Sequence, residues 1–232
     1  MQMTFKNIVK EQVPPQVIIS IIFVAMLAIG YGVWSQETSG TIALSAPTYG
    51  TELYVDGQIA GVSKSAGEKM SYQYIEGKHS VIVSRGDFWP WTKDVTLSAK
   101  ETETLRPLLV RKDVKPSLVV AKVYNNGVIS ESPEYTDALA RIDGAVISDQ
   151  IKAALAPIQF KDVRSADYFP GRTDVLLVAV NDGVFAVETG TSTPRNFLPV
   201  YKGTSPEFVL SDNSSILVKD GSSIFRIVGF DK

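Results

Sequence analysis

Three aromatic side chains lie close together in the stretch "RGDFWPWTK": Phe88, Trp89 and Trp91. Exposed aromatic rings at this spacing can stack on sugar rings, which favours a carbohydrate-binding site. Rings of this size can instead fill the core of a small domain, which otherwise buries little surface. Strand alternation places Trp89 and Trp91 on one side and Phe88 on the other, so at most one set faces solvent. The sequence leaves the core interpretation and the ligand interpretation open.

His79 is the only histidine of the chain, and cysteine is absent. Metal sites and most acid–base or nucleophilic mechanisms need several such side chains close together. We therefore interpret His79 as a surface residue without a metal or catalytic role. The stretch "SDNSS" at residues 211–215 offers oxygen atoms that suit calcium, but it lacks the regular D-x-D-x-D loop and is typical of a turn. The sequence predicts no metal and no cofactor.

The sequence contains no catalytic motif of the common classes, such as G-x-S-x-G, H-E-x-x-H or a Walker loop. Acidic residues can act as a carboxylate pair of the glycosidase type. The candidates for such a pair are Asp162, Asp167, Asp174 and Asp182. Because acidic residues are ordinary in β-turns, an envelope hydrolase is only a distant alternative. We predict no catalytic residue and a protein that is not an enzyme.

The charge balance argues against nucleic acid as a partner. The chain has 25 acidic and 23 basic residues, for a formal net charge of −2. A protein that holds a phosphate backbone normally carries a basic surplus. With 44% hydrophobic and 21% charged residues, the composition is that of a globular protein. A length of 232 residues suffices for one or two modest domains beside a targeting segment.

A long apolar run near the amino terminus predicts a membrane anchor. Residues 17–34, "VIISIIFVAMLAIGYGVW", contain no charged side chain, and a helix of this length rises about 27 Å, close to the thickness of a bilayer core. We expect a transmembrane helix at 17–34, with the more positive tail 1–16 in the cytoplasm and the domains after the linker 35–39 outside the cell. A cleaved signal peptide and a buried helix are the alternatives.

Short alternating strands with turn signals follow from residue 40. Leu53 and Val55 share one face in "TELYVDGQ", where Asp56-Gly57 supplies a hairpin turn. Val81 and Val83 alternate in "HSVIVS", and the same pattern recurs in "KDVTLSA". Strands of this length with turns at short intervals predict a compact β-sandwich over residues 40–112.

This stretch resembles the PEGA domain, a small β-sandwich module of bacterial and archaeal envelope proteins. The resemblance covers roughly residues 40–110 and rests on "SAPTYGTELYVDG" and "EGKHSVIVSRGDFWPWTKDVTL". The chain departs from the family in one extra residue within 47–51 and in Lys64-Ser65, where a Thr-Pro pair is usual. The resemblance implies a non-catalytic extracytoplasmic module that is often tethered to a membrane, with carbohydrate or a surface layer as the suspected ligand.

The second half, residues 113–232, contains an internal repeat. "DVLLVAVNDGVFAVE" matches "SSILVKDGSSIFRIV" at an offset of 40 residues, and a weaker copy begins at "PSLVVAKVYNNGVISES". A period of about 40 residues is typical of propeller blades, each copy being a hairpin. Ser132-Pro133 and Ser148-Asp149 predict two helix starts, so we expect a helical insert at about 132–157. The result is a truncated propeller-like domain whose open edge packs on the first domain or on a second copy.

Together these patterns predict a mainly β fold with an amino-terminal transmembrane helix. The favoured function is a single-pass, membrane-anchored envelope protein that displays its domains for scaffolding, or for binding a surface polysaccharide or protein. The partners would be the lipid bilayer at residues 17–34, such an envelope component, and a second copy of the chain. The alternative is a carbohydrate-binding module that uses Phe88, Trp89 and Trp91.

Overall fold

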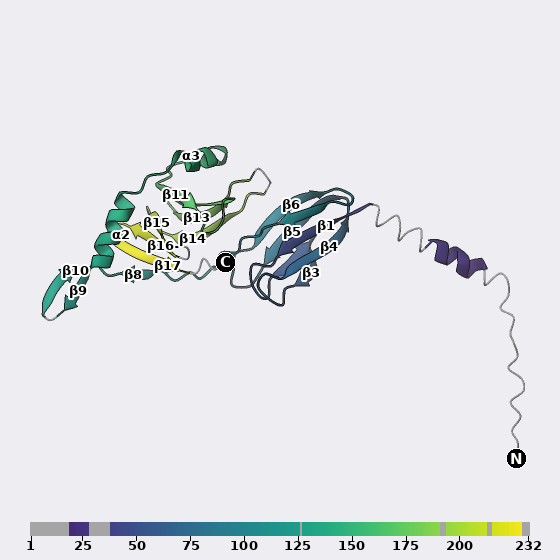
Figure 1. The fold of residues 1–232 in the computed structure, drawn as a ribbon, viewed down its shortest axis with the longest axis horizontal. Coiled ribbons are helices and arrows are strands. Elements are labelled where there is room, and N and C mark those ends of the chain that lie inside the picture. The colour runs from purple at the N-terminus through teal and green to yellow at the C-terminus, as the bar shows by residue number, and fades with distance from the viewer. Residues whose placement is uncertain (1–18, 28–37, 126, 191–193, 213–214, 229–232) are drawn as a thin grey trace, which may run out of the picture.

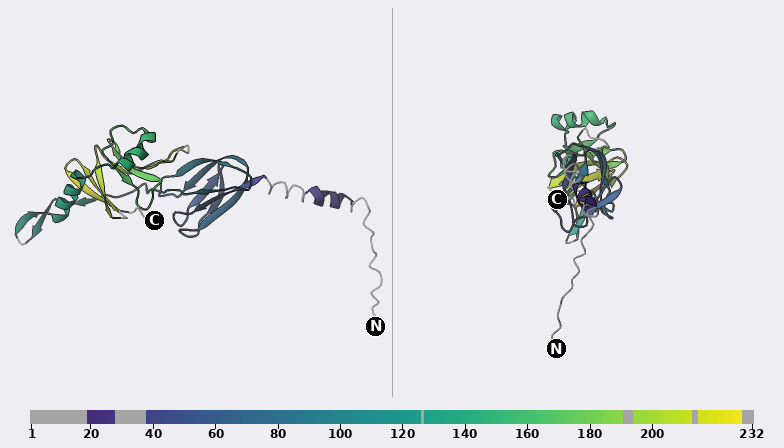
Figure 2. Two further views of the ribbon diagram at one scale, coloured as in Figure 1. Left: turned by 45° about the horizontal axis from the view of Figure 1, so that its top comes forward. Right: turned by 90° about the vertical axis from the view of Figure 1, so that its right-hand side faces the viewer.

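The fold consists of two β domains that lie side by side (Figure 1). The computed structural model describes residues 19–27, 38–125, 127–190, 194–212 and 215–228. Two further views show an elongated body that is narrow when seen end-on (Figure 2). The predicted mainly β character agrees with the secondary structure of these residues.

The membrane anchor predicted at residues 17–34 is wrong. In this run the structure describes helical residues at 19–27. The rest of the run lies outside the described residues. Nowhere in the described ranges does a helix combine the length and the apolar character that a membrane crossing needs. The single-pass topology depends on that anchor and is therefore wrong as well, and so is the predicted location with a cytoplasmic tail 1–16 and the domains outside.

The first domain is a sandwich of two sheets. One sheet has the order β4 (Lys69–Ile75), β1 (Ser39–Ser45) and β7 (Thr102–Leu105), with β1 and β7 parallel. The other has the order β3 (Gln58–Val62), β2 (Glu52–Val55), β5 (Gly77–Ser84) and β6 (Trp91–Leu97). The alternation read from the sequence holds in most strands, where one side is buried, whereas the edge strand β3 has no fully buried residue. The core includes Ile42, Leu44, Leu53, Val55, Val81, Val83, Val95 and Leu97.

The turn between β2 and β3 is the one that the sequence predicts. Asp56 has φ 53° and Gly57 has φ 77°, which are the two positive values that a type I′ hairpin turn requires. Glycine takes such a conformation without strain, and aspartate tolerates it better than most residues. The turn thus fixes the register in which Leu53 and Val55 both face the core.

The second domain contains two four-stranded antiparallel sheets. The first runs β11 (Ser165–Tyr168), β12 (Val175–Val180), β13 (Gly183–Glu188) and β14 (Phe197–Lys202). The second runs β15 (Glu207–Asp212), β16 (Ser215–Asp220), β17 (Ser223–Val228) and β8 (Ser117–Val119). The repeat read from the sequence corresponds to equivalent hairpins, since β12 and β13 begin 40 residues before β16 and β17. The upstream strand β8 pairs antiparallel with β17 and completes the second sheet.

Both sheets are covered on both faces, and this differs from the truncated propeller that we expected. Leu177 of β12 and Val218 of β16 share one core, so the sheets pack on each other. Leu176 and Val178 point the other way, into a cluster with Ile151 of α3 (Asp149–Leu155). Leu217 and Ile224 pack in the same manner against Ala138 and Ile142 of α2 (Pro133–Asp143). The helical insert therefore supplies the outer layers that further blades would supply in a ring.

The predicted helix starts are correct. The Ser132 side chain accepts a hydrogen bond from the Tyr135 N–H at the start of α2, and Ser148 does the same for Ile151 in α3. After α3 the chain passes through a 3-10 turn at Ala156–Ile158, which contains Pro157.

Helix α2 is further fixed to its sheet by two ion pairs. Arg226 Nη2 lies 2.9 Å from Glu134 Oε1, and Lys219 Nζ lies 2.5 Å from Asp143 Oδ1.

A separate hairpin leaves the body at the end far from the first domain (Figure 1). It consists of β9 (Lys122–Asn125) and β10 (Val128–Glu131), which form a sheet of their own. Tyr124 is 76% exposed and Ile129 is 67% exposed, although both are large apolar side chains. The weak third repeat copy is thus split between this hairpin and β8.

Candidate functional site

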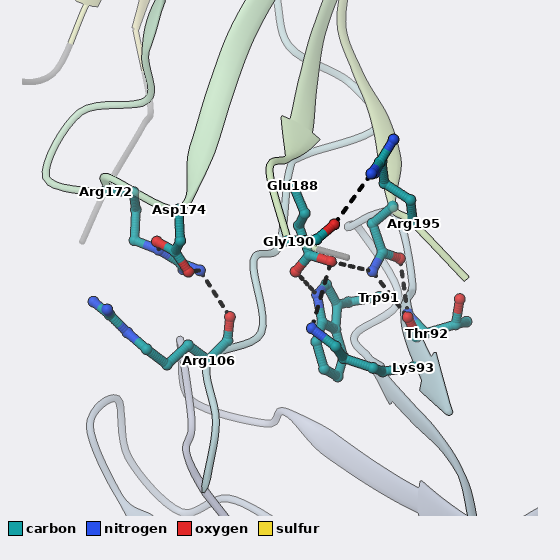
Figure 3. Close-up of polar contacts among 10 residues, drawn as sticks. Trp91, Thr92, Lys93, Arg106, Arg172, Asp174, Glu188, Gly190 and Arg195 are labelled. Carbon is teal, nitrogen blue, oxygen red and sulfur yellow. Dashed lines mark hydrogen bonds and ion pairs between the residues drawn. The ribbon is translucent and has the colours of Figure 1, made fainter. Parts of the chain in front are cut away.

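The two domains meet at Trp91, the first residue of β6. Its side chain is 1% exposed, and its indole N–H donates a hydrogen bond of 2.6 Å to Glu188 Oε1 at the end of β13 (Figure 3). Glu188 is itself only 7% exposed. A buried carboxylate is costly unless it is paired, and Lys93 Nζ lies 3.9 Å from Glu188 Oε2 and 5.6 Å from the centre of the Trp91 ring. The junction is therefore a buried and charge-balanced contact.

Asn196 completes the same network from the segment before β14. Its Nδ2 donates to Glu188 Oε2 at 3.1 Å and to the Thr92 carbonyl at 2.8 Å. Its Oδ1 accepts from the Thr92 N–H at 2.9 Å. Because β6 is an edge strand of its sheet, the carboxamide binds the open backbone of Thr92 as a neighbouring strand would. One buried amide thus protects the sheet edge and joins the domains.

A second polar contact crosses the junction beside the first (Figure 3). Arg172 binds both carboxylate oxygens of Asp174, at 2.7 and 2.8 Å, and its Nη2 also donates to the Arg106 carbonyl at 2.9 Å. The hydrogen bonds from Arg172 lower the pKa of Asp174 below its usual value, despite partial desolvation. This arginine therefore joins the second domain to the segment that leaves the sandwich.

The structure separates the three predicted ligand residues. Trp91 is buried in the junction and cannot stack on a ligand. The guanidinium groups of Arg85 and Arg111 lie 5.2 and 5.4 Å from the centre of the Phe88 ring, which is thus already in contact with two cations. Trp89 is half-buried and packs at the margin of the core. Of the three side chains, Trp89 is the one that lines a groove.

We predicted that Trp89 and Trp91 lie on one side of a strand, and this prediction is wrong. Strand β6 begins only at Trp91, and Pro90 separates the two tryptophans. The residues before it pair with the interdomain segment instead, since the Trp89 N–H donates to the Val110 carbonyl at 2.8 Å. The two-residue alternation of a strand does not extend through this segment.

Trp89 lines a groove between the two domains with a volume of 330 Å³. Arg111 and Lys112 lie on the same wall, and Tyr201 and Lys202 of β14 lie on the opposite wall. The Lys112 ammonium lies 5.9 Å from the centre of the Trp89 ring. None of the described residues that line this groove is acidic. The groove is thus aromatic and positive, although the whole chain has a slight negative charge.

Tyr201 contributes a neutral ring to this groove. Partial burial, together with the hydrogen bond that its hydroxyl donates to Asp220 at 3.1 Å, raises the pKa of Tyr201 to about 12. The phenol therefore stays protonated over the physiological range. It adds apolar surface without adding a negative charge.

His79 is not an isolated surface residue. Its Nδ1 lies 2.8 Å from Asp56 Oδ2 and its Nε2 lies 2.7 Å from the Ile75 carbonyl. Since both partners accept hydrogen bonds, the doubly protonated ring is the form that makes both contacts at once. Desolvation lowers the pKa of His79, but the hydrogen bonds to Asp56 and Ile75 outweigh it and raise the pKa above the ordinary value. The ion pair fastens the β2–β3 turn to β5.

Two of the four candidate aspartates, Asp174 and Asp182, do not form the carboxylate pair of a glycosidase. Asp174 and Asp182 flank the two ends of β12, so they are separated by more than about 20 Å of extended chain. Catalytic carboxylates lie less than about 10 Å apart. Asp162 has φ 57° in a loop, and Asp167 accepts a hydrogen bond from the Tyr168 N–H.

Across the described ranges, no group of three or more His, Asp or Glu side chains suits a metal ion. The candidate calcium stretch 211–215 lies partly outside those ranges.

Sequence analysis did not identify Glu188, Asn196, Thr92 or Arg172. Glu188 ends the apolar stretch "GVFAVE", where a terminal carboxylate normally faces solvent. Its indole partner lies 97 residues away in the chain. The one local signal is the size of the Trp91 side chain, which favours burial but does not indicate what covers it.

Comparison with known proteins gave no match to a protein-family model, to a curated protein or to a solved structure. The resemblance of residues 40–110 to the PEGA domain therefore stays a prediction.

Replacing Trp91 with phenylalanine tests the junction. Trp91→Phe keeps an aromatic ring but removes the hydrogen bond to the buried Glu188 carboxylate. A hydrogen bond to a charged group contributes about 1.5–3 kcal/mol, so we expect the free energy of unfolding to fall by that amount. The interdomain segment 106–116 should also become more sensitive to limited proteolysis. Denaturant unfolding and protease digestion measure the two effects.

Trp89→Phe is the matched control for that variant. The Trp89 side chain is half-buried and lies outside the Glu188 network, so its loss should cost less than about 1 kcal/mol. Equal destabilisation by the two variants would show that Trp91 acts only through its bulk and not through its N–H.

The His79–Asp56 pair predicts a pH dependence of stability. Because the pKa of His79 is raised, its contribution is fully present below the unfolded value of 6.5 and is lost as the pH rises through the folded value. The pKa of Asp56 is lowered, first by the His79 hydrogen bond, so its contribution is lost only in acid. The stability difference between the natural chain and His79→Ala should therefore shrink as the pH rises above the unfolded value of 6.5. A difference that is constant over this range in denaturant unfolding, or an NMR titration of His79 at or below 6.5, would contradict the assignment.

Proposed function

We propose that this chain is a non-enzymatic binding protein that presents a two-domain surface to a polysaccharide or a protein. The observation that supports this most is the junction. Trp91, Glu188 and Asn196 hold the sandwich and the second domain together through buried hydrogen bonds, and a fixed surface binds with less loss of conformational entropy than a mobile one.

The ionisable side chains whose types could act in catalysis are held in hydrogen bonds or ion pairs within the protein. His79 is paired with Asp56, Asp174 with Arg172, and Glu188 with Trp91 and Asn196. A general acid or base must instead reach the substrate with its titrating atom. If residues 40–110 are a PEGA domain, the family implies a non-catalytic role as well.

A co-sedimentation experiment tests this proposal with the full chain. Insoluble polysaccharide and protein fractions of the producing cells are incubated with the chain, and the supernatant is analysed for reducing sugars and for new peptide amino termini. We expect saturable binding to one fraction without released product. Asn196→Ala should bind more weakly, because it frees the Thr92 backbone and loosens the junction. Product release, or absence of binding to every fraction, would contradict the proposal.

The exposed hairpin favours a second copy of the chain as a further partner. An isolated two-stranded hairpin is only marginally stable in water, and Tyr124 and Ile129 form an exposed apolar pair across it. Lys122 lies opposite Glu131 next to that pair. A two-fold related copy can place each Lys122 against the Glu131 of the other copy, which is the self-complementarity that a symmetric dimer requires. We therefore propose that two hairpins pack face to face.

Sedimentation measures the expected effect on the oligomeric state. The natural chain should sediment as a dimer, and Ile129→Asp should sediment as a monomer because it places a charge in the apolar contact. Val146→Asp is the matched control, since Val146 is 86% exposed in a loop away from the hairpin. A monomeric natural chain, or equal dissociation by both variants, would contradict the dimer.

A further inference from the structure

The groove beside Trp89 has the chemistry of an anion site. Its two walls carry three cations, Arg111, Lys112 and Lys202, and all three side chains are exposed. The volume of 330 Å³ lies at the lower end of the range for ligand pockets. A ligand in this groove would therefore meet positive charge from both domains at once.

Neighbouring groups hold two of these cations, Lys112 and Arg111, in position. Lys112 Nζ donates to the Gly86 carbonyl at 3.1 Å, which places its charge near the Trp89 ring. Arg111 is placed by the bridge between its backbone and Phe88, and its guanidinium lies over the Phe88 ring. The three side chains carry like charges around one groove and repel one another, and a bound anion would relieve that repulsion.

The aromatic side chains restrict the type of anion. Trp89 offers part of its indole, and Tyr201 offers a neutral ring from the other wall. Flat apolar surface beside cations matches a sugar ring that carries an acidic substituent, because the C–H face of the ring packs on the indole and the carboxylate meets the cations. A nucleic-acid strand needs cations along a longer path than one groove supplies, and the net charge of −2 opposes it.

From these observations, we propose that the Trp89 groove binds an acidic saccharide, with Arg111, Lys112 and Lys202 holding its anionic group and Trp89 contacting its ring. The inference rests on the proposed binding function and names the ligand class. The junction also positions one wall of the groove, because β14, which carries Tyr201 and Lys202, follows directly after Asn196. The network that joins the domains thereby sets the width of the groove.

Titration calorimetry with the full chain tests this assignment. The probes are an oligogalacturonate and a neutral malto-oligosaccharide of equal length. We expect the natural chain to bind the acidic probe alone, with an affinity that falls as salt is added. Lys202→Glu should weaken binding about tenfold or more, and Trp89→Ala by a similar factor. Trp89→Phe should keep most of the affinity, because it keeps an aromatic face.

Lys161→Glu is the matched control for charge. Lys161 is also exposed but lies outside the groove, in the loop before β11, so the same change of charge should alter the affinity less than about twofold. Thermal unfolding checks that each variant is folded. Lys202 is exposed, so Lys202→Glu keeps the test decisive if Trp89→Ala does not fold.

Three results would overturn the assignment: equal binding of the neutral and acidic probes, equal weakening by Lys161→Glu and Lys202→Glu, or tighter binding of single-stranded DNA. If the chain still sediments with a cellular fraction after Lys202→Glu, the groove assignment fails while the proposed binding function stands. If the natural chain binds neither probe and no fraction, both fail.

Discussion

The hydrogen bond between the Trp91 indole and the Glu188 carboxylate is the contact on which the arrangement of the two domains depends. Either group alone would be costly at this position, because a buried carboxylate without donors and a buried N–H without an acceptor both lose their hydration. Together with Asn196 they satisfy each other. The contact is also directional, so it specifies one orientation of the domains, whereas an apolar interface of the same area would tolerate several.

This constraint explains why the sandwich edge at β6 can remain without a neighbouring strand in its own sheet. An open edge invites pairing with other chains. Here the Asn196 carboxamide binds both backbone groups of Thr92, and the second domain covers the strand end. The residues just before β6 are tied to the interdomain segment by backbone bonds at Val110 and Lys112. The same contacts therefore protect the edge of the sheet and attach the second domain.

Local features of the fold were predictable from the sequence, and contacts distant in the chain were not. Asp56-Gly57 fixed a hairpin because only a few residues accept two positive φ angles in succession. Ser132 and Ser148 indicated helix starts for an equally local reason. The apolar run at 17–34 satisfied the length criterion for a membrane helix, yet no helix among the described residues is long and apolar enough to cross a membrane.

The sequence repeat correctly indicated two equivalent hairpins, but our interpretation of it as part of a propeller was incomplete. Two hairpins 40 residues apart do adopt equivalent positions, but the stretch "VLLVAV" is buried on both faces. A strand without polar alternation indicates cover on each side, and for this strand the cover is provided by α3 and by the facing sheet rather than by further blades. The candidate site shows the same limit. The aromatic cluster indicated the right region, while Glu188, Asn196 and Lys202 could be assigned to it only once the second domain was placed.

The pairing of β8 with β17 has a consequence for the architecture as a whole. The strand that enters the second domain and the strand that completes it are hydrogen-bonded neighbours, with Ser117 opposite Arg226. A domain whose entry and exit lie together can be inserted into another chain as a module, or be permuted, without a change in its packing. The same pairing also affects the order of folding. Strand β8 can pair only after β17 has been synthesised, whereas α2, α3 and the sheet β11–β14 can form before that.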